Sequence, residues 1–173
     1  MSRCIVDTNV PIVANGRPDP DDARPPSFVC RMAALNFLTA LVENGKVLVD
    51  DAGAIITEYR RHLNPKGQPG VGDRFYQLIL QSAPKRVERL PLPTREDGEY
   101  EDLPQMLIDI GFDPSDRKFA AMAKRYVTPV YNATDSDWLE DAEVLQLAGI
   151  EVRQLCGVDP AAWFAGGIPG RDT

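Results

Sequence analysis

The chain of 173 residues carries a formal net charge of −7 and has a pI near 4.7. This acidic balance excludes a protein that holds nucleic acid mainly by bulk electrostatics, but it leaves room for clustered acids whose charge bound cations offset. The composition, with 43% hydrophobic and 26% charged residues, is that of a globular protein. The length predicts one domain over residues 1–165 and a frayed tail over residues 166–173.

No apolar run approaches the roughly 18 residues that cross a bilayer, and the first residues lack the basic stretch and cleavage site of a signal peptide. We therefore expect a cytoplasmic protein without a membrane segment. The cysteines are odd in number and far apart, and none belongs to a Cys-x-x-Cys pair. This spacing indicates neither a disulfide framework nor a zinc site, so we expect buried thiols at Cys4, Cys30 and Cys156.

The chain begins with an apolar strand, Cys4 to Val6, that stops at Asp7. Such a strand is typical of the centre of a parallel sheet, and its carboxyl end lies at the edge where α/β folds keep their sites. Ser27 is the expected cap of a helix that ends at Asn44-Gly45, and a strand follows over residues 46–50. This order predicts two parallel strands joined by a crossover helix.

The rest of the chain alternates between helices and short strands, which predicts an α/β fold. We expect strands over residues 87–92, 129–133 and 150–155, and helices over residues 54–63, 74–81 with Asp73 as its cap, 103–110, 117–126, 138–148 and 159–164. A Pro-rich segment over residues 14–26 and an acidic segment over residues 94–102 are predicted loops, the second of them exposed.

Acidic residues recur at the boundaries of these elements. Besides Asp7 they are Glu58, Asp113, Asp116, Asp135 and Asp137. Four carboxylates in one pocket cannot all stay ionised cheaply unless a divalent cation lies among them. Plainer interpretations are open at this point, because Glu58 fits an exposed helix position equally well and one aspartate of the Asp113–Asp116 segment fits a helix cap.

Taken together, these segments resemble the PIN-domain nucleases over nearly the whole chain. The resemblance rests on Val6-Asp7-Thr8-Asn9-Val10, on Glu58 within a helix, on Asp113-Pro114-Ser115-Asp116 before an Ala-rich helix, and on Thr134-Asp135-Ser136-Asp137. The subgroup that the chain looks nearest to contains toxin components of toxin–antitoxin pairs. The resemblance implies a three-layer α/β/α sandwich with a central parallel sheet of about four to five strands.

The resemblance also implies roles for individual residues. The catalytic, metal-binding acids would be Asp7, Glu58, Asp116 and Asp135, with Asp113 and Asp137 as second candidates. Asn9 would orient Asp7, and Arg117 and Lys118 would bind substrate. The implied cofactor is Mg²⁺ or Mn²⁺, because hard cations take oxygen ligands. The implied function is a divalent-metal-dependent endoribonuclease acting on single-stranded RNA, with a cognate antitoxin protein and a second copy of the chain as further candidate partners.

Two other functions stay open. A catalytically weak PIN-like RNA-binding or scaffold module would keep the acids without cleaving RNA. An aspartyl-phosphate phosphatase also places an aspartate after its first strand, but such phosphatases need a second aspartate two residues later, where this chain has Asn9. The only histidine, His62, is expected on a helix surface and only weakly supports a nucleophile–histidine triad.

Overall fold

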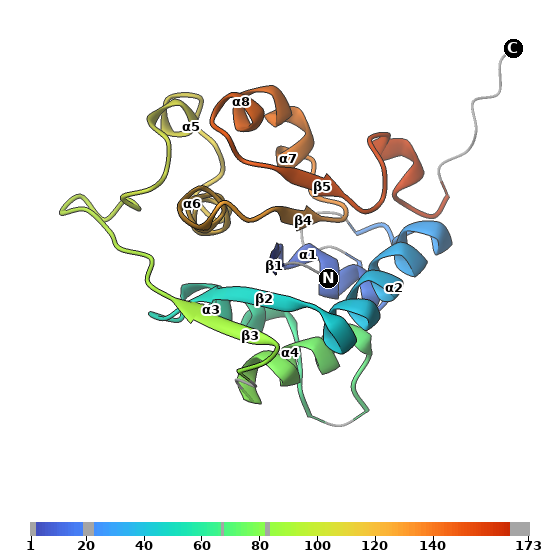
Figure 1. Ribbon diagram of the computed structural model, residues 1–173. Coiled ribbons are helices and arrows are strands. Elements are labelled where there is room, and N and C mark those ends of the chain that lie inside the picture. The colour runs from blue at the N-terminus through green and yellow to red at the C-terminus, as the bar shows by residue number, and fades with distance from the viewer. Residues whose placement is uncertain (1–2, 19–22, 67, 82–83, 167–173) are drawn as a thin grey trace, which may run out of the picture.

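The computed structural model describes residues 3–18, 23–66, 68–81 and 84–166. A sheet of five strands, in the order β3-β2-β1-β4-β5, lies at its centre, and every pair of neighbouring strands is parallel. The strands are β1 (Arg3–Val6), β2 (Lys46–Asp50), β3 (Val87–Leu90), β4 (Val130–Asn132) and β5 (Val152–Gln154). Helices flank the sheet, and Figure 1 shows α2 and α6 on opposite sides of it. The predicted α/β/α sandwich is therefore confirmed.

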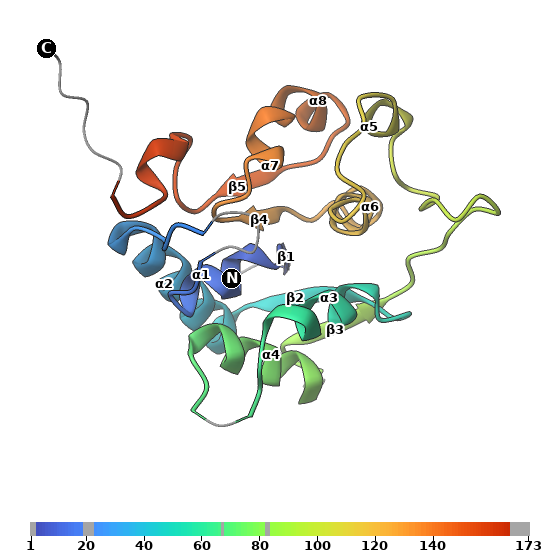
Figure 2. The same cartoon turned by 180° about the vertical axis from the view of Figure 1, so that it is seen from behind.

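The helices of the described residues are mostly short. They are α1 (Asn9–Ala14), α2 (Phe28–Asn44), α3 (Ala54–His62), α4 (Val71–Gln81), α5 (Gln105–Asp109), α6 (Arg117–Tyr126), α7 (Asp137–Glu140), α8 (Ala142–Leu147) and the 3₁₀ helix η1 (Pro160–Ala162). The view from behind in Figure 2 shows the same layers, with α1, α2 and α4 gathered together. The expected cap of α2 is confirmed, since the Ser27 hydroxyl accepts a hydrogen bond from the Cys30 N–H at 3.2 Å.

Strand β1 is the central strand because its side chains suit burial on both faces. Cys4, Ile5 and Val6 are all buried, as expected for an apolar run in a parallel sheet. From β1 the chain builds β2 and β3 on one side and β4 and β5 on the other, so the strand order reverses at β1. In open α/β sheets, such a reversal leaves a crevice at the carboxyl ends of the strands. Asp7 follows β1 directly and lies at this crevice.

Several local predictions are corrected. The predicted helix over residues 138–148 is two helices, α7 and α8, because the backbone of Asp141 leaves helical geometry (φ −94°, ψ 12°). Residues 9–14, for which no helix was predicted, form the fully buried helix α1. Asp73 does not cap α4 but lies in its first turn, where its buried carboxylate accepts hydrogen bonds from the N–H groups of Asn64 and Gly70.

The prediction of three thiols is wrong for two of the cysteines. Cys30, in the first turn of α2, forms a disulfide with Cys156, which follows β5. The same two segments are joined by a backbone hydrogen bond from the Ser27 N–H to the Trp163 carbonyl at 2.8 Å. Cys4 is a buried free thiol, as expected, and burial raises its pKa to about 12.

The remaining expectations concern the surface and the ends of the chain. Within the described ranges, no helix has the length and apolar character needed to cross a membrane. The expected tail begins at Gly166, but residues 167–173 lie outside the described residues. The acidic loop is not wholly solvated, because Glu99 pairs with Arg117 at 2.6 Å and Asp102 pairs with Arg125 at 2.8 Å, which ties the loop to α6.

Candidate metal centre

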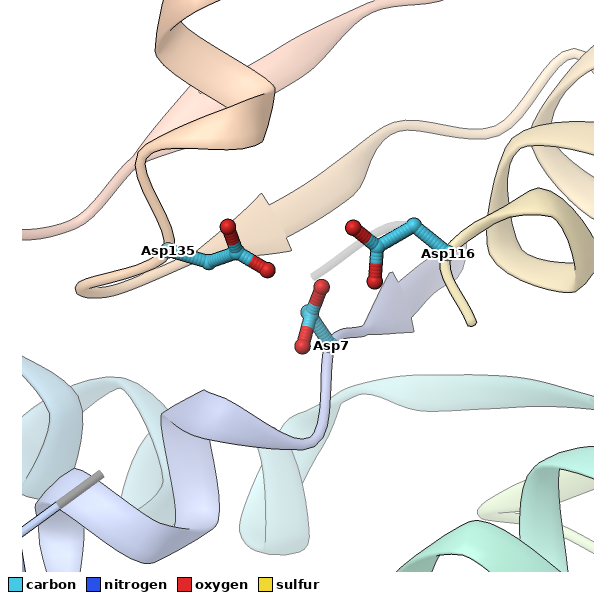
Figure 3. A group of neighbouring side chains, drawn as sticks. All are labelled: Asp7, Asp116 and Asp135. Atoms are coloured by element: carbon cyan, nitrogen blue, oxygen red, sulfur yellow. The ribbon is translucent and has the colours of Figure 1, made fainter. Parts of the chain in front are cut away.

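Three aspartates from distant parts of the sequence converge at the crevice, as Figure 3 shows. Asp7 follows β1, Asp135 follows β4, and Asp116 is the N-cap residue of α6. One carboxylate oxygen of each lies within 4.8 Å of those of the other two. Asp116 makes no capping hydrogen bond with its side chain, so its carboxylate faces the cluster rather than the helix. The spacing is one that a single divalent ion can bridge.

Asp7 is held in place from two directions. One carboxylate oxygen accepts a hydrogen bond from the backbone N–H of Asn9 at 3.1 Å, and the other accepts one from the indole N–H of Trp138 in α7. Asp7 is only 3% exposed, and Trp138 is fully buried. Two donors fix the orientation of this carboxylate without neutralising its charge.

A pair of buried asparagines joins the ends of β1 and β4. The side-chain amide of Asn9 donates to the Asn132 side-chain oxygen at 2.8 Å, and its own oxygen accepts from the Ala133 N–H at 2.8 Å. The Asn132 amide in turn donates to the Asp135 carbonyl at 2.8 Å. Asn9 therefore orients Asp7 through its backbone, while its side chain sets the position of the loop that carries Asp135.

Glu58 reaches the same crevice from α3. This helix is fixed at its start by Asp50, whose carboxylate accepts from the Ala54 and Ile55 N–H groups, both at 2.8 Å. It is fixed further along by the Tyr59 hydroxyl, which donates to the Val6 carbonyl at 2.6 Å. Because Tyr59 binds the last residue of β1, the neighbouring Glu58 lies beside Asp7.

The carboxylate of Glu58 has its own partners. It accepts a hydrogen bond from the Thr8 hydroxyl at 3.2 Å and forms an ion pair with Lys118 of α6. The side chains of Lys118 and Glu58 are 9% and 15% exposed, so the pair is largely shielded from water. Glu58 lies outside the group of three aspartates within 4.8 Å, and its predicted role as a metal ligand stays a prediction.

The other predicted residues lie around this centre. Arg117 does not extend into solvent but pairs with Glu99 and donates to the Phe112 carbonyl at 2.9 Å. Asp113 accepts hydrogen bonds from the N–H and hydroxyl of Ser115, at 2.7 and 2.6 Å, and thus stabilises the turn before α6. The backbone N–H of Asp137 donates to the Asp135 carboxylate at 2.9 Å. The predicted role of Arg117 and Lys118 in substrate binding is not tested by these contacts.

Burial and mutual repulsion disfavour charge on the cluster. Burial raises the pKa of Asp7 to about 8, the charge of Asp135 adds to the rise, and the Asn9 and Trp138 hydrogen bonds oppose it. Burial raises the pKa of Asp116 to about 10, with further contributions from Asp7 and Asp135. Without a cation, protonated carboxyls are therefore favoured at neutral pH, and a divalent ion would reverse that preference.

The cluster opens into a hollow of about 240 Å³, called the site hollow below. Its wall includes the three aspartates and Glu58, together with Arg61 and His62 at the end of α3. The lining is mainly polar, and the acids lie at its base because Asp7 and Asp116 are buried. This arrangement can hold a hard cation and admit a charged group to it.

Sequence reasoning missed several residues that build the site. Trp138 was interpreted only as the start of a helix, and Asn132 only as part of a strand, although a buried asparagine at the end of an apolar strand is itself a signal of a polar network. Thr8, which binds Glu58, was placed in the first motif without a role. The partners of Trp138, Asn132 and Thr8 lie 131, 123 and 50 positions away in the sequence, so the fold is needed to identify them.

Comparisons with family models, with curated proteins and with solved structures find no match to this chain.

Proposed function

We propose that the protein is a divalent-metal-dependent ribonuclease that hydrolyses phosphodiester bonds of single-stranded RNA. The observation that carries the proposal is the convergence of Asp7, Asp116 and Asp135 at the base of a polar hollow, at the reversal point of a parallel sheet. The choice of RNA as substrate is supported by the resemblance of the four acidic segments to PIN-domain nucleases.

The donor set suits Mg²⁺ or Mn²⁺. All three groups offer carboxylate oxygens, which hard cations prefer, and the cluster contains no sulfur or imidazole ligand. Asp7, Asp116 and Asp135 would hold the ion. When bound, such an ion lowers the pKa of its water and stabilises negative charge on a phosphate.

The chain's own residues position this chemistry. Trp138 and the Asn9 N–H keep the Asp7 carboxylate aimed at the cluster, and the two asparagines hold the Asp135 loop against β1. Lys118 holds Glu58 at the edge of the site hollow, where the carboxylate can accept a proton from a group that enters. The burial of Asp7 and Asp116 limits competing water, which strengthens electrostatic interactions there.

An RNA substrate is consistent with a cytoplasmic protein, and we keep that compartment as part of the proposal. The Cys30–Cys156 disulfide is unusual for a compartment that keeps thiols reduced. Neither cysteine lines the site hollow, so the proposed chemistry does not depend on the bond. A toxin role with a cognate antitoxin and a homodimeric state are proposals that rest on the resemblance alone.

We expect that protein stripped with EDTA will not cleave a labelled single-stranded RNA of mixed sequence, and that added Mn²⁺ or Mg²⁺ will restore cleavage. The reason is that, without a cation, the cluster has no group that lowers the pKa of a water or offsets the charge of a phosphodiester. The measurement is a gel time course with a hairpin-free RNA, and the same strand in a duplex serves as the control. Cleavage that persists in EDTA, or no cleavage with any divalent ion, would contradict the proposal and favour a binding or scaffold module.

A further inference from the structure

A second hollow, of about 660 Å³, adjoins the site hollow at the end of α3. Its cationic wall is formed by Arg60, Arg61 and Lys66, and we call it the basic hollow. Arg61 and His62 line both hollows, so the two hollows are adjacent. The basic hollow is therefore next to the site hollow, within reach of a chain that extends from it.

The cations of the basic hollow differ from those nearer the aspartates. Arg60, Arg61 and Lys66 are exposed, and among the described residues no carboxylate lies within ion-pairing distance of their side chains. In contrast, Arg117 forms an ion pair with Glu99, and Lys118 forms one with Glu58. In a protein with a net charge of −7, unpaired cations beside an acidic site form a local positive surface that suits an anionic chain.

A third hollow, of about 350 Å³, lies on the other side of Glu58 and is lined by Gly53, Thr57, Arg61 and Tyr100 among others. It shares Glu58 and Arg61 with the site hollow. A Cβ at Gly53 would meet no atom within 4 Å, which shows that its wall is open there. Arg61 lines all three hollows and therefore lies where they adjoin one another.

We propose that the basic hollow binds the phosphate backbone of the RNA strand next to the bond being cleaved, with Arg61 at the junction and Lys66 further out. This inference rests on the proposed nuclease function and specifies how its substrate is held. It assigns the phosphate contacts to the exposed, unpaired cations of the α3 end, while Arg117 and Lys118 hold the protein's own acids. Phosphate contacts of this kind are independent of base identity and depend on salt.

The test compares two double variants with equal change in net charge. Arg61→Gln/Lys66→Gln removes two cations from the basic hollow. Lys46→Gln/Lys85→Gln removes two cations at the amino ends of the strands, since Lys46 is the first residue of β2 and Lys85 lies just before β3. The probe is a fluorescein-labelled 12-nucleotide oligouridylate, and binding is followed by fluorescence anisotropy in Ca²⁺ at several salt concentrations, with gels to show that the strand stays intact. Thermal melts check that all variants fold.

We expect the basic-hollow variant to bind about tenfold more weakly and to lower the slope of log K against log salt by about 1.4, since each lost single-strand phosphate contact removes about 0.7. The Lys46/Lys85 control should bind within about twofold of the parent, and Arg61→Lys, which keeps the charge, should retain most of the affinity. Equal binding by the basic-hollow variant and the parent, with Mn²⁺-dependent cleavage intact, would overturn this assignment but not the proposed function. A parent that neither binds nor cleaves RNA would overturn both.

Discussion

Replacing Asp116 by Asn is expected to lower kcat/KM for RNA cleavage at least about a hundredfold, which corresponds to about 2.7 kcal/mol of transition-state stabilisation. The substitution keeps the shape of the side chain but removes the negative charge that this buried carboxylate, within 4.8 Å of Asp7 and Asp135, would carry with an ion bound. Because the Asp116 side chain does not cap α6, the fold should not need its charge. Initial rates with Mn²⁺ at pH 7.5, measured on protein of confirmed melting temperature, give the comparison.

The matched control is Asp113→Asn, from the same short segment. The Asp113 carboxylate accepts hydrogen bonds from the N–H and hydroxyl of Ser115 and lies outside the cluster of three aspartates. We expect the kcat/KM of this variant to stay within about threefold of the parent value, because a hydrogen bond within a surface turn contributes little to transition-state stabilisation. If Asp116→Asn cleaves as fast as Asp113→Asn, the aspartate cluster is not the site, or the activity comes from a contaminating nuclease.

Replacing Lys118 by Met is expected to destabilise the metal-free protein by about 3 kcal/mol, at the lower end of the range for breaking a buried ion pair. Glu58 would keep its charge in a shielded position beside Asp7 but lose its cationic partner. A loss of this size lowers the melting temperature by roughly 6–12 °C in a domain of this length. Urea unfolding in EDTA measures it.

Two further variants distinguish the stability lost with the Lys118–Glu58 ion pair from the stability lost by replacing any long lysine side chain. In Lys118→Met/Glu58→Gln no lone charge is left, so most of the lost stability should return. Lys124→Met removes another lysine of α6, whose ammonium donates to the Ala148 carbonyl at 2.8 Å, and should cost about 1 kcal/mol. If Lys118→Met and Lys124→Met lose equal stability, Lys118 does not offset the charge of Glu58.

The architecture could be predicted because each helix and strand follows from a pattern of residues that are close together in the sequence. The apolar run that ends at Asp7 and the capped helix that starts at Ser27 each depend on neighbouring residues, and both are present as expected. The α7–α8 break could not be predicted, because Leu139, Ala142 and Leu145 keep a helical spacing across it. The disulfide was missed because its cysteines are 126 residues apart, and only the packing of the segment after β5 against the start of α2 brings them together.

The site was predictable in part for the same reason. Asp7, Asp116 and Asp135 each lie at an element boundary, and parallel strands bring such boundaries to one edge of the sheet. The surroundings were not predictable, because a long side chain can reach several partners. The pairing of Lys118 with Glu58 was not expected from the sequence, and the predicted role of Lys118 in substrate binding stays a prediction. Arg61 and Lys66, which have no carboxylate partner among the described residues, lie in the basic hollow.

The most direct test of the account is a calorimetric titration of EDTA-stripped, dialysed protein with Mn²⁺ at pH 6, 7 and 8. Because burial and repulsion raise the pKa values of Asp7 and Asp116, Mn²⁺ must displace protons from the cluster. The affinity should therefore rise as the pH rises, by up to about tenfold per pH unit for each proton displaced. We predict that the parent binds Mn²⁺ with proton release, that Asp137→Asn binds it about equally well, and that Asp135→Asn binds it at least about tenfold more weakly. Binding that is independent of pH and equally strong in Asp135→Asn would contradict a metal centre at these three aspartates.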